Sequence, residues 1–191
     1  MGIINIFKKL DDLTKTKSTN KNISPNSMEK YNNIYPENVI NRNNKRNEIE
    51  HKRFLLQEKY NPLIQQHYKY DEEIEKKYKM AINQDNIDNE YTRKCEEICA
   101  LDIKLSEQLI DYYKNDIELQ NEAYNFGIDT LPCYNAYIRL SQIYEKRKEY
   151  SAAINICNLA IKNGYTYESS KSDMFIRKAR LEKKLNKMIN K

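Results

Sequence analysis

Glycine and proline are scarce in this sequence of 191 residues, which contains three glycines, four prolines and no tryptophan. Tight turns depend on glycine and proline, so the composition offers little material for the many turns of a β-sandwich or a barrel. No segment alternates apolar and polar residues for long enough to predict a strand. Lysine, glutamate, leucine, isoleucine and tyrosine are abundant, and this composition favours long helices joined by short loops. We therefore expect an all-α fold.

Long hydrophobic runs are also absent. The longest stretch without a charge, Tyr150–Ile161, has only 12 residues and contains a serine and two asparagines, whereas a membrane-spanning helix needs about 18 or more apolar residues. Near the first residue, Asn5 interrupts the apolar run and acidic Asp11 and Asp12 follow it, so no signal peptide is expected. Ile6 stands where a myristoylation motif would have a serine or threonine. These absences predict a cytoplasmic protein, at most peripheral to a membrane.

Cysteine and histidine are too few for a disulfide scaffold or a zinc site. The cysteines are Cys95, Cys99, Cys133 and Cys157, and the histidines are His51 and His67. Secreted disulfide scaffolds are shorter and richer in cysteine, and zinc sites use CxxC pairs or histidines close to cysteines. We expect cysteines that pack in the core of a protein in a reducing compartment, with no metal and no cofactor.

Catalytic motifs are missing as well. The sequence contains no GxSxG, no glycine-rich phosphate loop and no HExxH, the patterns that position a nucleophile, a phosphate or a zinc ion. His67 lies on an apolar helical stripe, so we interpret it as a packed core histidine. Adjacent carboxylates such as Glu72–Glu73 lie on different faces of a helix, which is typical of a solvated surface. The sequence therefore predicts a protein that is not an enzyme.

Charge is unevenly distributed. Residues 1–46 contain nine Lys and Arg against four Asp and Glu, which accounts for the whole net charge of +5. A balanced remainder is not typical of a dedicated nucleic-acid-binding protein. The segment 171–191 is nevertheless basic, with eight basic and two acidic residues, and its candidate basic patch consists of Arg177, Lys178, Arg180 and Lys184. Such a segment either contacts phosphates or forms a capping helix with a solvated outer face, and both interpretations stay open.

The chain divides by composition into three parts. Residues 1–13 have apolar side chains at helical spacing (Ile3, Ile6, Phe7, Leu10 and Leu13), which predicts a short amphipathic helix. Residues 14–46 are rich in Asn, Ser, Thr and Lys and predict a flexible linker. Residues 47–191 predict a helical domain. Three roles are open for the 1–13 segment. It docks on a protein (its own body or a partner), it contacts a membrane surface, or it has no role.

Residues 47–191 predict six or seven helices stacked as an irregular solenoid of helical hairpins. The expected helices cover residues 48–60, a segment that begins at Asn61–Pro62, a segment from about Asn89 with a break near Lys104–Ser106 and a stop at Gly127, residues 134–147, residues 150–162, and a last helix from about Ser172. The predicted core includes Tyr137, Leu140, Tyr144, Ala153, Cys157, Ala160 and Leu181.

The most specific pattern covers residues 134–167 and reads YNAYIRLSQIYEKRKEYSAAINICNLAIKNGYTY. Small residues stand where two short antiparallel helices would cross, which allows close approach. The segment resembles a tetratricopeptide repeat, a helix–turn–helix unit of 34 residues. Three positions depart from that pattern, since Lys148 replaces the turn glycine, Cys157 a phenylalanine and Tyr165 a proline. The first departure implies a strained or rearranged turn.

The wider arrangement of residues 70–187 is similar to that of a group of uncharacterised bacterial proteins with one late repeat. The shared features are Leu131-Pro132 before the repeat, IYEK at residues 143–146 within it, and CEEICALDIKL at residues 95–105 upstream. This resemblance implies a helical fold and no known activity.

In tetratricopeptide repeats, the first helix of each hairpin lines the concave partner-binding surface. The resemblance thus implies a groove at Asn135, Ile138, Arg139, Gln142, Glu145 and Lys146, unless these residues form an ordinary solvated face. Arg139, Gln142 and Lys146 would hold a carboxylate, because arginine binds that group bidentately. We expect a non-catalytic adaptor for a protein or peptide. The alternative is a nucleic-acid-associated protein that uses the basic C-terminal helix, and the oligomeric state is left open.

Overall fold

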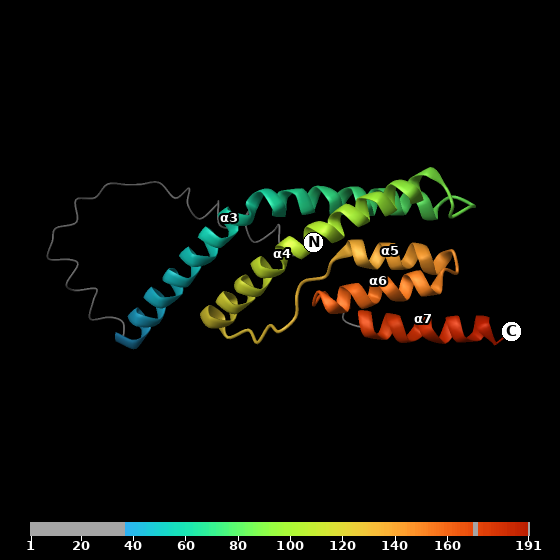
Figure 1. Cartoon of the computed structure of the whole chain (residues 1–191). Helices are drawn as coiled ribbons and strands as arrows, with labels where there is room; N and C mark the ends of the chain where they lie inside the picture. Colours follow the sequence, from blue (N-terminus) through green and yellow to red (C-terminus); the bar gives the residue numbers. More distant parts are fainter. Residues whose placement is uncertain (1–36, 170–171, 191) are drawn as a thin grey trace. The chain divides into compact units, whose positions relative to one another are not determined.

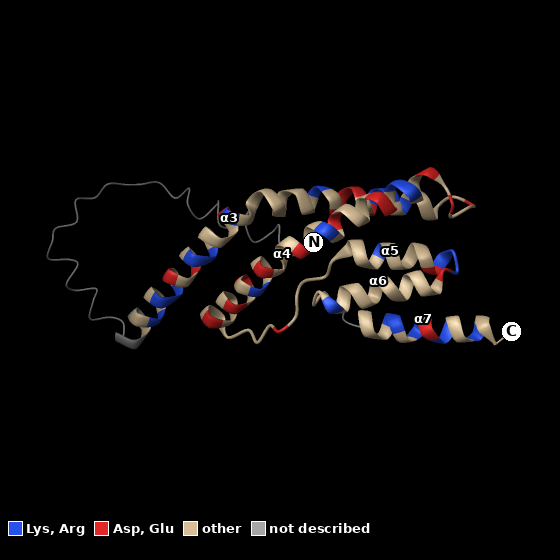
Figure 2. Ribbon diagram, viewed as in Figure 1, with Lys and Arg blue, Asp and Glu red and all other residues tan. Residues whose placement is uncertain are grey.

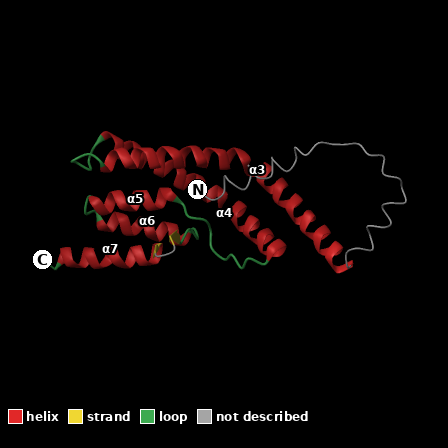
Figure 3. Cartoon of the chain, turned by 180° about the vertical axis from the view of Figure 1, so that it is seen from behind, coloured by secondary structure: helices red, strands yellow, loops and turns green. Residues whose placement is uncertain are grey.

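The computed structural model describes residues 37–169 and 172–190, and it confirms the predicted all-α class. The described elements are α3 (Glu37–Ile82), α4 (Glu90–Tyr124), α5 (Asn135–Lys146), α6 (Tyr150–Lys162), β1 (Tyr167–Ser169), β2 (Ser172–Asp173) and α7 (Met174–Ile189) (Figures 1 and 3). The chain divides into two units, residues 1–43 and 44–191. Helix α3 begins in the first unit, and every contact discussed below lies in the second. The predicted helix over residues 1–13 lies outside the described residues.

Helix α3 is longer and more continuous than the sequence predicted. Residues 37–46, which we placed in the linker over 14–46, are helical, and Pro62 lies inside the helix instead of starting a new one. A proline in a helix interior removes one backbone hydrogen bond and costs about 3 kcal/mol. Packing offsets this cost, because Ile64 is buried against Leu105 and Leu109 of α4 directly after the proline.

Helix α4 runs antiparallel to α3. Arg53 Nε donates to Asp116 Oδ1 at 2.8 Å far from the connecting loop, whereas the Cys95 thiol lies 3.7 Å from the carbonyl oxygen of Ile74 close to it. The side chain of Asn89 caps the first turn of α4 by accepting a hydrogen bond from the Thr92 amide, as its position in the sequence predicts. The two long helices therefore form one hairpin, to which the remaining helices attach.

The predicted break in α4 near Lys104–Ser106 is wrong. The Ser106 hydroxyl donates to the carbonyl oxygen of Ile103 within the continuous helix and also bonds to the hydroxyl of Tyr137 on α5. Serine is a common helix-capping residue, but here these two bonds keep its side chain satisfied inside the helix. The helix ends at Tyr124, before the expected stop at Gly127, and the cap residue Asn125 adopts the left-handed conformation with φ 54°.

Helices α5, α6 and α7 lie side by side in chain order (Figure 1). Of the predicted core, Tyr137, Leu140, Ala153, Cys157, Ala160 and Leu181 are buried, and Tyr144 is partly buried. Helix α6 has the predicted bounds to the residue, and α5 is one residue shorter at each end. Helix α7 begins at Met174 because Asp173 caps it by accepting from the Ile176 amide at 2.8 Å; the predicted cap was Ser172.

The turn between α5 and α6 confirms the expected strain, because Lys148 has φ 63°. A side chain in the left-handed region costs about 1–2 kcal/mol relative to the right-handed region. Between α6 and α7, β1 and β2 form a short antiparallel pair that the sequence did not predict (Figure 3). Its strands are only three and two residues long, which is too short for periodicity to reveal them.

Close packing of the α5–α6 hairpin predicts sensitivity to added volume. Ala153→Leu and Ala160→Leu each insert three carbons at a fully buried position and should lower the free energy of unfolding by about 1–3 kcal/mol. Asn155→Leu, at an exposed position of the same helix, should change it by less than about 0.5 kcal/mol. Urea unfolding measures all three, and equal stability of the buried and exposed variants would contradict the packing.

The strained turn predicts a stabilising substitution. Lys148→Gly should raise the free energy of unfolding by roughly 0.5–1 kcal/mol, after allowance for the greater freedom of glycine in the unfolded chain. Asn125→Gly is the matched control. Because asparagine tolerates the left-handed region, this variant should gain less free energy of unfolding than Lys148→Gly. Thermal and urea unfolding measure both variants. Equal stabilisation of the two variants, or a loss of stability in Lys148→Gly, would contradict the interpretation that the turn is strained.

Candidate functional site: a basic groove lined by α3, α5 and α7

The first two turns of α5 face α3. Asn135 Nδ2 donates to Asp71 Oδ1 at 2.9 Å, and Arg139 donates to both carboxylate oxygens of Glu75, from Nε at 2.6 Å and from Nη2 at 3.0 Å. Both pairs join residues 64 apart in the sequence, so α5 runs parallel to this part of α3. Of the predicted groove residues, Asn135 and Arg139 therefore bind α3, and Ile138 is buried in the core. The Arg139 guanidinium is already occupied by a carboxylate of its own chain.

The last turns of α5 border an open groove of about 400 Å³. Its lining residues are Tyr78 of α3, Gln142, Glu145 and Lys146 of α5, and Arg177, Arg180 and Lys184 of α7. The structure thus brings half of the predicted partner groove together with three of the four residues of the predicted basic patch. Lys178, the fourth, does not line the groove and lies 3.8 Å from Glu182 of its own helix. We call this site the basic groove.

Glu145 is the carboxylate on which the cations of α7 converge. Its Oε2 accepts from Arg180 Nη2 at 2.8 Å, and its Oε1 accepts from Lys184 Nζ at 2.7 Å. Partial burial alone would raise the pKa of this carboxyl, but the hydrogen bond from Lys184 and the charges of Arg180, Lys184 and Arg177 together hold it below its usual value. Glu145 is therefore ionised at neutral pH.

Arg177 is the most buried cation of the basic groove, with 4% of its surface exposed. Its Nε donates to Glu168 Oε2 at 3.1 Å, and its Nη2 donates to Glu168 Oε1. Its Nη1 is buried and makes no hydrogen bond to any residue that the structure describes; Glu145 Oε2 lies 3.6 Å away. A buried donor without a hydrogen-bond acceptor costs about 1–3 kcal/mol. The charge of Glu145 at 3.6 Å offsets part of that cost, and an acceptor at hydrogen-bond distance would recover the rest.

Positive charge exceeds negative charge in the basic groove. Lys146, Arg177, Arg180 and Lys184 oppose Glu145, which gives the lining residues a net charge of +3. Counting Glu168, which binds Arg177 from outside the lining, reduces this charge to +2. Figure 2 shows basic residues along α7. The arrangement attracts an anion, because cations on low-dielectric walls raise the local concentration of negative ligands.

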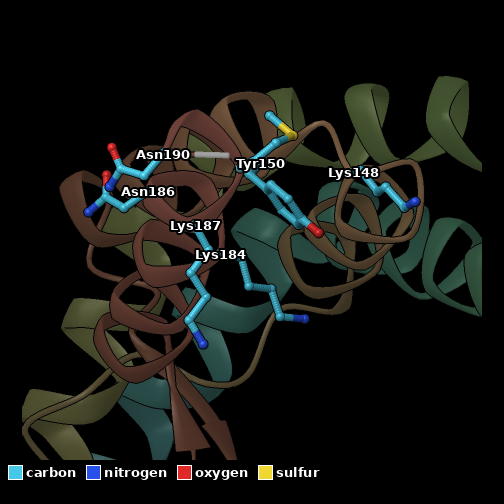
Figure 4. Close-up of a pocket in the computed structure, with 7 residues that line it drawn as sticks. Lys148, Tyr150, Lys184, Asn186, Lys187 and Asn190 are labelled. Carbon is cyan, nitrogen blue, oxygen red and sulfur yellow. The ribbon is translucent and has the colours of Figure 1, made fainter.

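The positive surface continues past Lys184, which also borders a second, larger depression of about 620 Å³. Figure 4 shows Lys184 and Lys187 of α7 at its edge, with Tyr150 and Lys148 on the side of the α5–α6 turn. Its three lysines, Lys148, Lys184 and Lys187, are all exposed. This surface extends the positive field of the basic groove without adding a buried donor.

A second cluster of polar side chains lies in the core. His67 Nδ1 lies 2.9 Å from Asp102 Oδ1, the Tyr134 hydroxyl donates to the same oxygen at 3.0 Å, and the rings of His67 and Tyr134 stack at 4.3 Å. Nearby, the Tyr165 hydroxyl donates to the carbonyl oxygen of Ser106. His67 is buried, which confirms the interpretation as a packed core histidine. These bonds join α3 and α4 to the residue that caps α5, so the cluster is structural.

Most of the cysteines are core residues. All four are free thiols; Cys95, Cys99 and Cys157 are buried, as predicted, and Cys133 is partly buried. Burial raises the pKa of Cys157 to about 11 and also raises that of Cys133, so both thiols stay protonated at neutral pH. Within residues 37–169 and 172–190, no three His, Cys, Asp or Glu side chains gather as metal ligands.

None of the described helices is long and apolar enough to cross a membrane.

No protein-family model, curated protein or solved structure matches this chain. The resemblance of residues 134–167 to a tetratricopeptide repeat therefore rests on the residues quoted above. Function resides in a site and not in a fold, so the basic groove is the feature of this chain that bears on function.

Sequence reasoning missed the contribution of Tyr78 and the burial of Arg177. Tyr78 follows Ile74 by four residues on the apolar stripe of α3. Its spacing predicts the buried core position that it occupies, but not that it also lines the groove. Arg177, Arg180 and Lys184 have spacings of three and four residues, which does place them on one helix face. That spacing was the available signal for a shared site, but only the packing of α7 reveals that the face meets Glu145.

The buried cluster predicts a pH-dependent contribution to stability. Burial raises the pKa of Asp102 despite the opposing hydrogen bonds from His67 and Tyr134, and the charge of Asp71 adds to the increase. Because the pKa is higher in the folded chain, folding takes up a proton. The contribution of Asp102 is therefore complete below about pH 4 and is lost as the pH rises through the raised pKa.

Asp102→Asn cannot ionise, so the stability of the wild type relative to this variant should fall as the pH rises above about 4. Urea unfolding over a pH series measures this difference. Tyr134→Phe keeps the carboxyl group and should keep the pH dependence. If the stability of the wild type relative to Asp102→Asn does not change with pH, or rises with pH, the raised pKa of Asp102 is refuted.

Proposed function

We propose that this chain is a non-catalytic adaptor that binds an acidic segment of a protein partner in the basic groove. The observation that carries the proposal is Arg177, a buried guanidinium whose Nη1 has no acceptor among the described residues and which lines an open groove with three further cations. Arginine in such a setting binds carboxylates and other planar or tetrahedral anions through charge-assisted hydrogen bonds.

The neighbouring hairpin supports the same function. Helices α5 and α6 pack through buried small residues, Ala153 and Ala160 among them, and the sequence of this segment resembles a repeat whose first helix binds partners. Helix α7 completes the groove by stacking on α6. The repeat assignment and the adaptor role form one proposal, in which α5 and α7 present polar side chains to a partner.

The alternative partner is a nucleic acid, since Lys184 and Lys187 extend the basic surface along α7. Phosphate contacts of this kind bind any sequence and weaken steeply with salt. The buried Arg177 and the single carboxylate at the centre of the groove favour a compact anionic group on a protein. Nucleic acid is therefore an outcome that the experiment must distinguish.

Capture from a cell lysate, quantified by mass spectrometry, tests the proposal. Arg180→Glu removes one charge-assisted hydrogen bond from the basic groove and reverses a charge, so partner capture should fall by roughly 10-fold or more. Lys178→Glu makes the same charge change on the same helix outside the groove and should leave capture unchanged. Arg139→Glu is unsuitable, because it would break the pair with Glu75 that holds α5.

Two results would count against the adaptor. Equal capture by Arg180→Glu and Lys178→Glu would show that the partner does not bind in the basic groove. Capture that disappears after nuclease treatment, together with direct binding of mixed nucleic acid and a steep salt slope, would favour the nucleic-acid alternative. Thermal unfolding of both variants checks that each retains the fold.

A further inference from the structure

We infer that the group bound in the basic groove is a phosphate monoester carried by the partner, such as a phosphorylated serine. This inference rests on the proposed adaptor function and specifies its ligand. Three properties of the groove support it: the size of its charge excess, the three cations that share one face of α7, and the acceptor that Arg177 lacks.

The charge excess matches a dianion better than a carboxylate. The lining residues carry a net charge of +3, or +2 when Glu168 is counted. A carboxylate of the partner would neutralise only one charge. A phosphate monoester carries about −1.5 to −2 at pH 7 and offers three acceptor oxygens. Of these two anionic groups, the phosphate monoester therefore comes closer to neutralising the net charge of the groove.

Glu145 occupies the position of such a ligand within the chain. Arg177, Arg180 and Lys184 follow one another at spacings of three and four residues, and all three lie within 3.6 Å of its two carboxylate oxygens. A carboxylate has two oxygens for three cations, and Arg177 Nη1 is the donor that receives none. A phosphate at this point supplies a third oxygen, which would meet that donor.

Lys146, Gln142 and Tyr78 line the same groove without a bond to Glu145. Lys146 is exposed and can turn towards a bound phosphate. When a phosphate enters, the Glu145 carboxylate has to leave the three cations, since two anions beside one another repel. Glu145 thus competes with the ligand, and a variant without this charge should bind phosphate more tightly than the wild type does.

The direct test titrates the full chain with two small probes under NMR observation of backbone amides. The probes are the N-acetyl methylamides of phosphoserine and of glutamate, with inorganic phosphate as a third arm. The phosphoserine probe should bind at least about fivefold more tightly than the glutamate probe, because it presents the larger charge. Its largest shifts should lie in the last turns of α5 and in α7.

The variants make the test specific. Glu145→Gln should tighten binding of the phosphoserine probe by roughly threefold or more, Arg180→Gln and Lys184→Gln should weaken it by at least that factor, and Lys178→Gln should have no effect. Equal affinity for the two amino-acid probes, or weaker binding by Glu145→Gln with its fold intact, would overturn the inference. Binding of inorganic phosphate alone, without the phosphoserine probe, would overturn a phosphoprotein as the source.

Phosphatase treatment of the lysate separates this inference from the adaptor function. If capture of the partner is lost after dephosphorylation, the phosphate inference is supported. If capture survives dephosphorylation yet still depends on Arg180, the adaptor function stands and the phosphate inference fails. If the groove variants never affect capture, both proposals fail together.

Discussion

The buried carboxylate of Asp102 is the constraint on which the arrangement of the helices depends. It contacts His67 on α3 and Tyr134 at the start of α5 from its place on α4, so one side chain joins three elements. A buried carboxylate is costly unless hydrogen bonds satisfy it, and each partner here comes from a different element. Sliding one helix along another would leave the carboxylate without partners, which favours a single register among the many that apolar packing alone would allow.

That register determines where the basic groove forms. With Tyr134 held at Asp102, the following turns of α5 place Asn135 and Arg139 opposite Asp71 and Glu75 of α3. Glu145 follows six residues after Arg139, where α7 supplies its cations. The groove is thus a consequence of helix lengths and register, and its polar side chains are positioned by contacts formed well away from it.

The sequence predicted the helical class, the bounds of α5 and α6 and most of their core, because apolar periodicity and small residues report directly on helix packing. It was wrong at Pro62 and near Lys104–Ser106, where burial of Ile64 and the Ser106–Tyr137 bond override local signals of a helix end. It named most of the groove residues but as two separate sites. Their union depends on the packing of α7 on α6, which brings the cations of α7 within reach of Glu145. No local pattern encodes this long-range contact, and the same contact explains why Arg177 is buried although it belongs to a basic surface segment.

Helix α7 is the last element of the stack, and it provides three of the four cations of the basic groove. The site therefore exists only while this helix is docked. Whatever binds there selects the docked state, and the free energy of binding adds to that of attachment by mass action. Occupancy of the groove and local opening of α7 are coupled equilibria, so the protection of the α7 amides from solvent exchange becomes a reporter of the bound state.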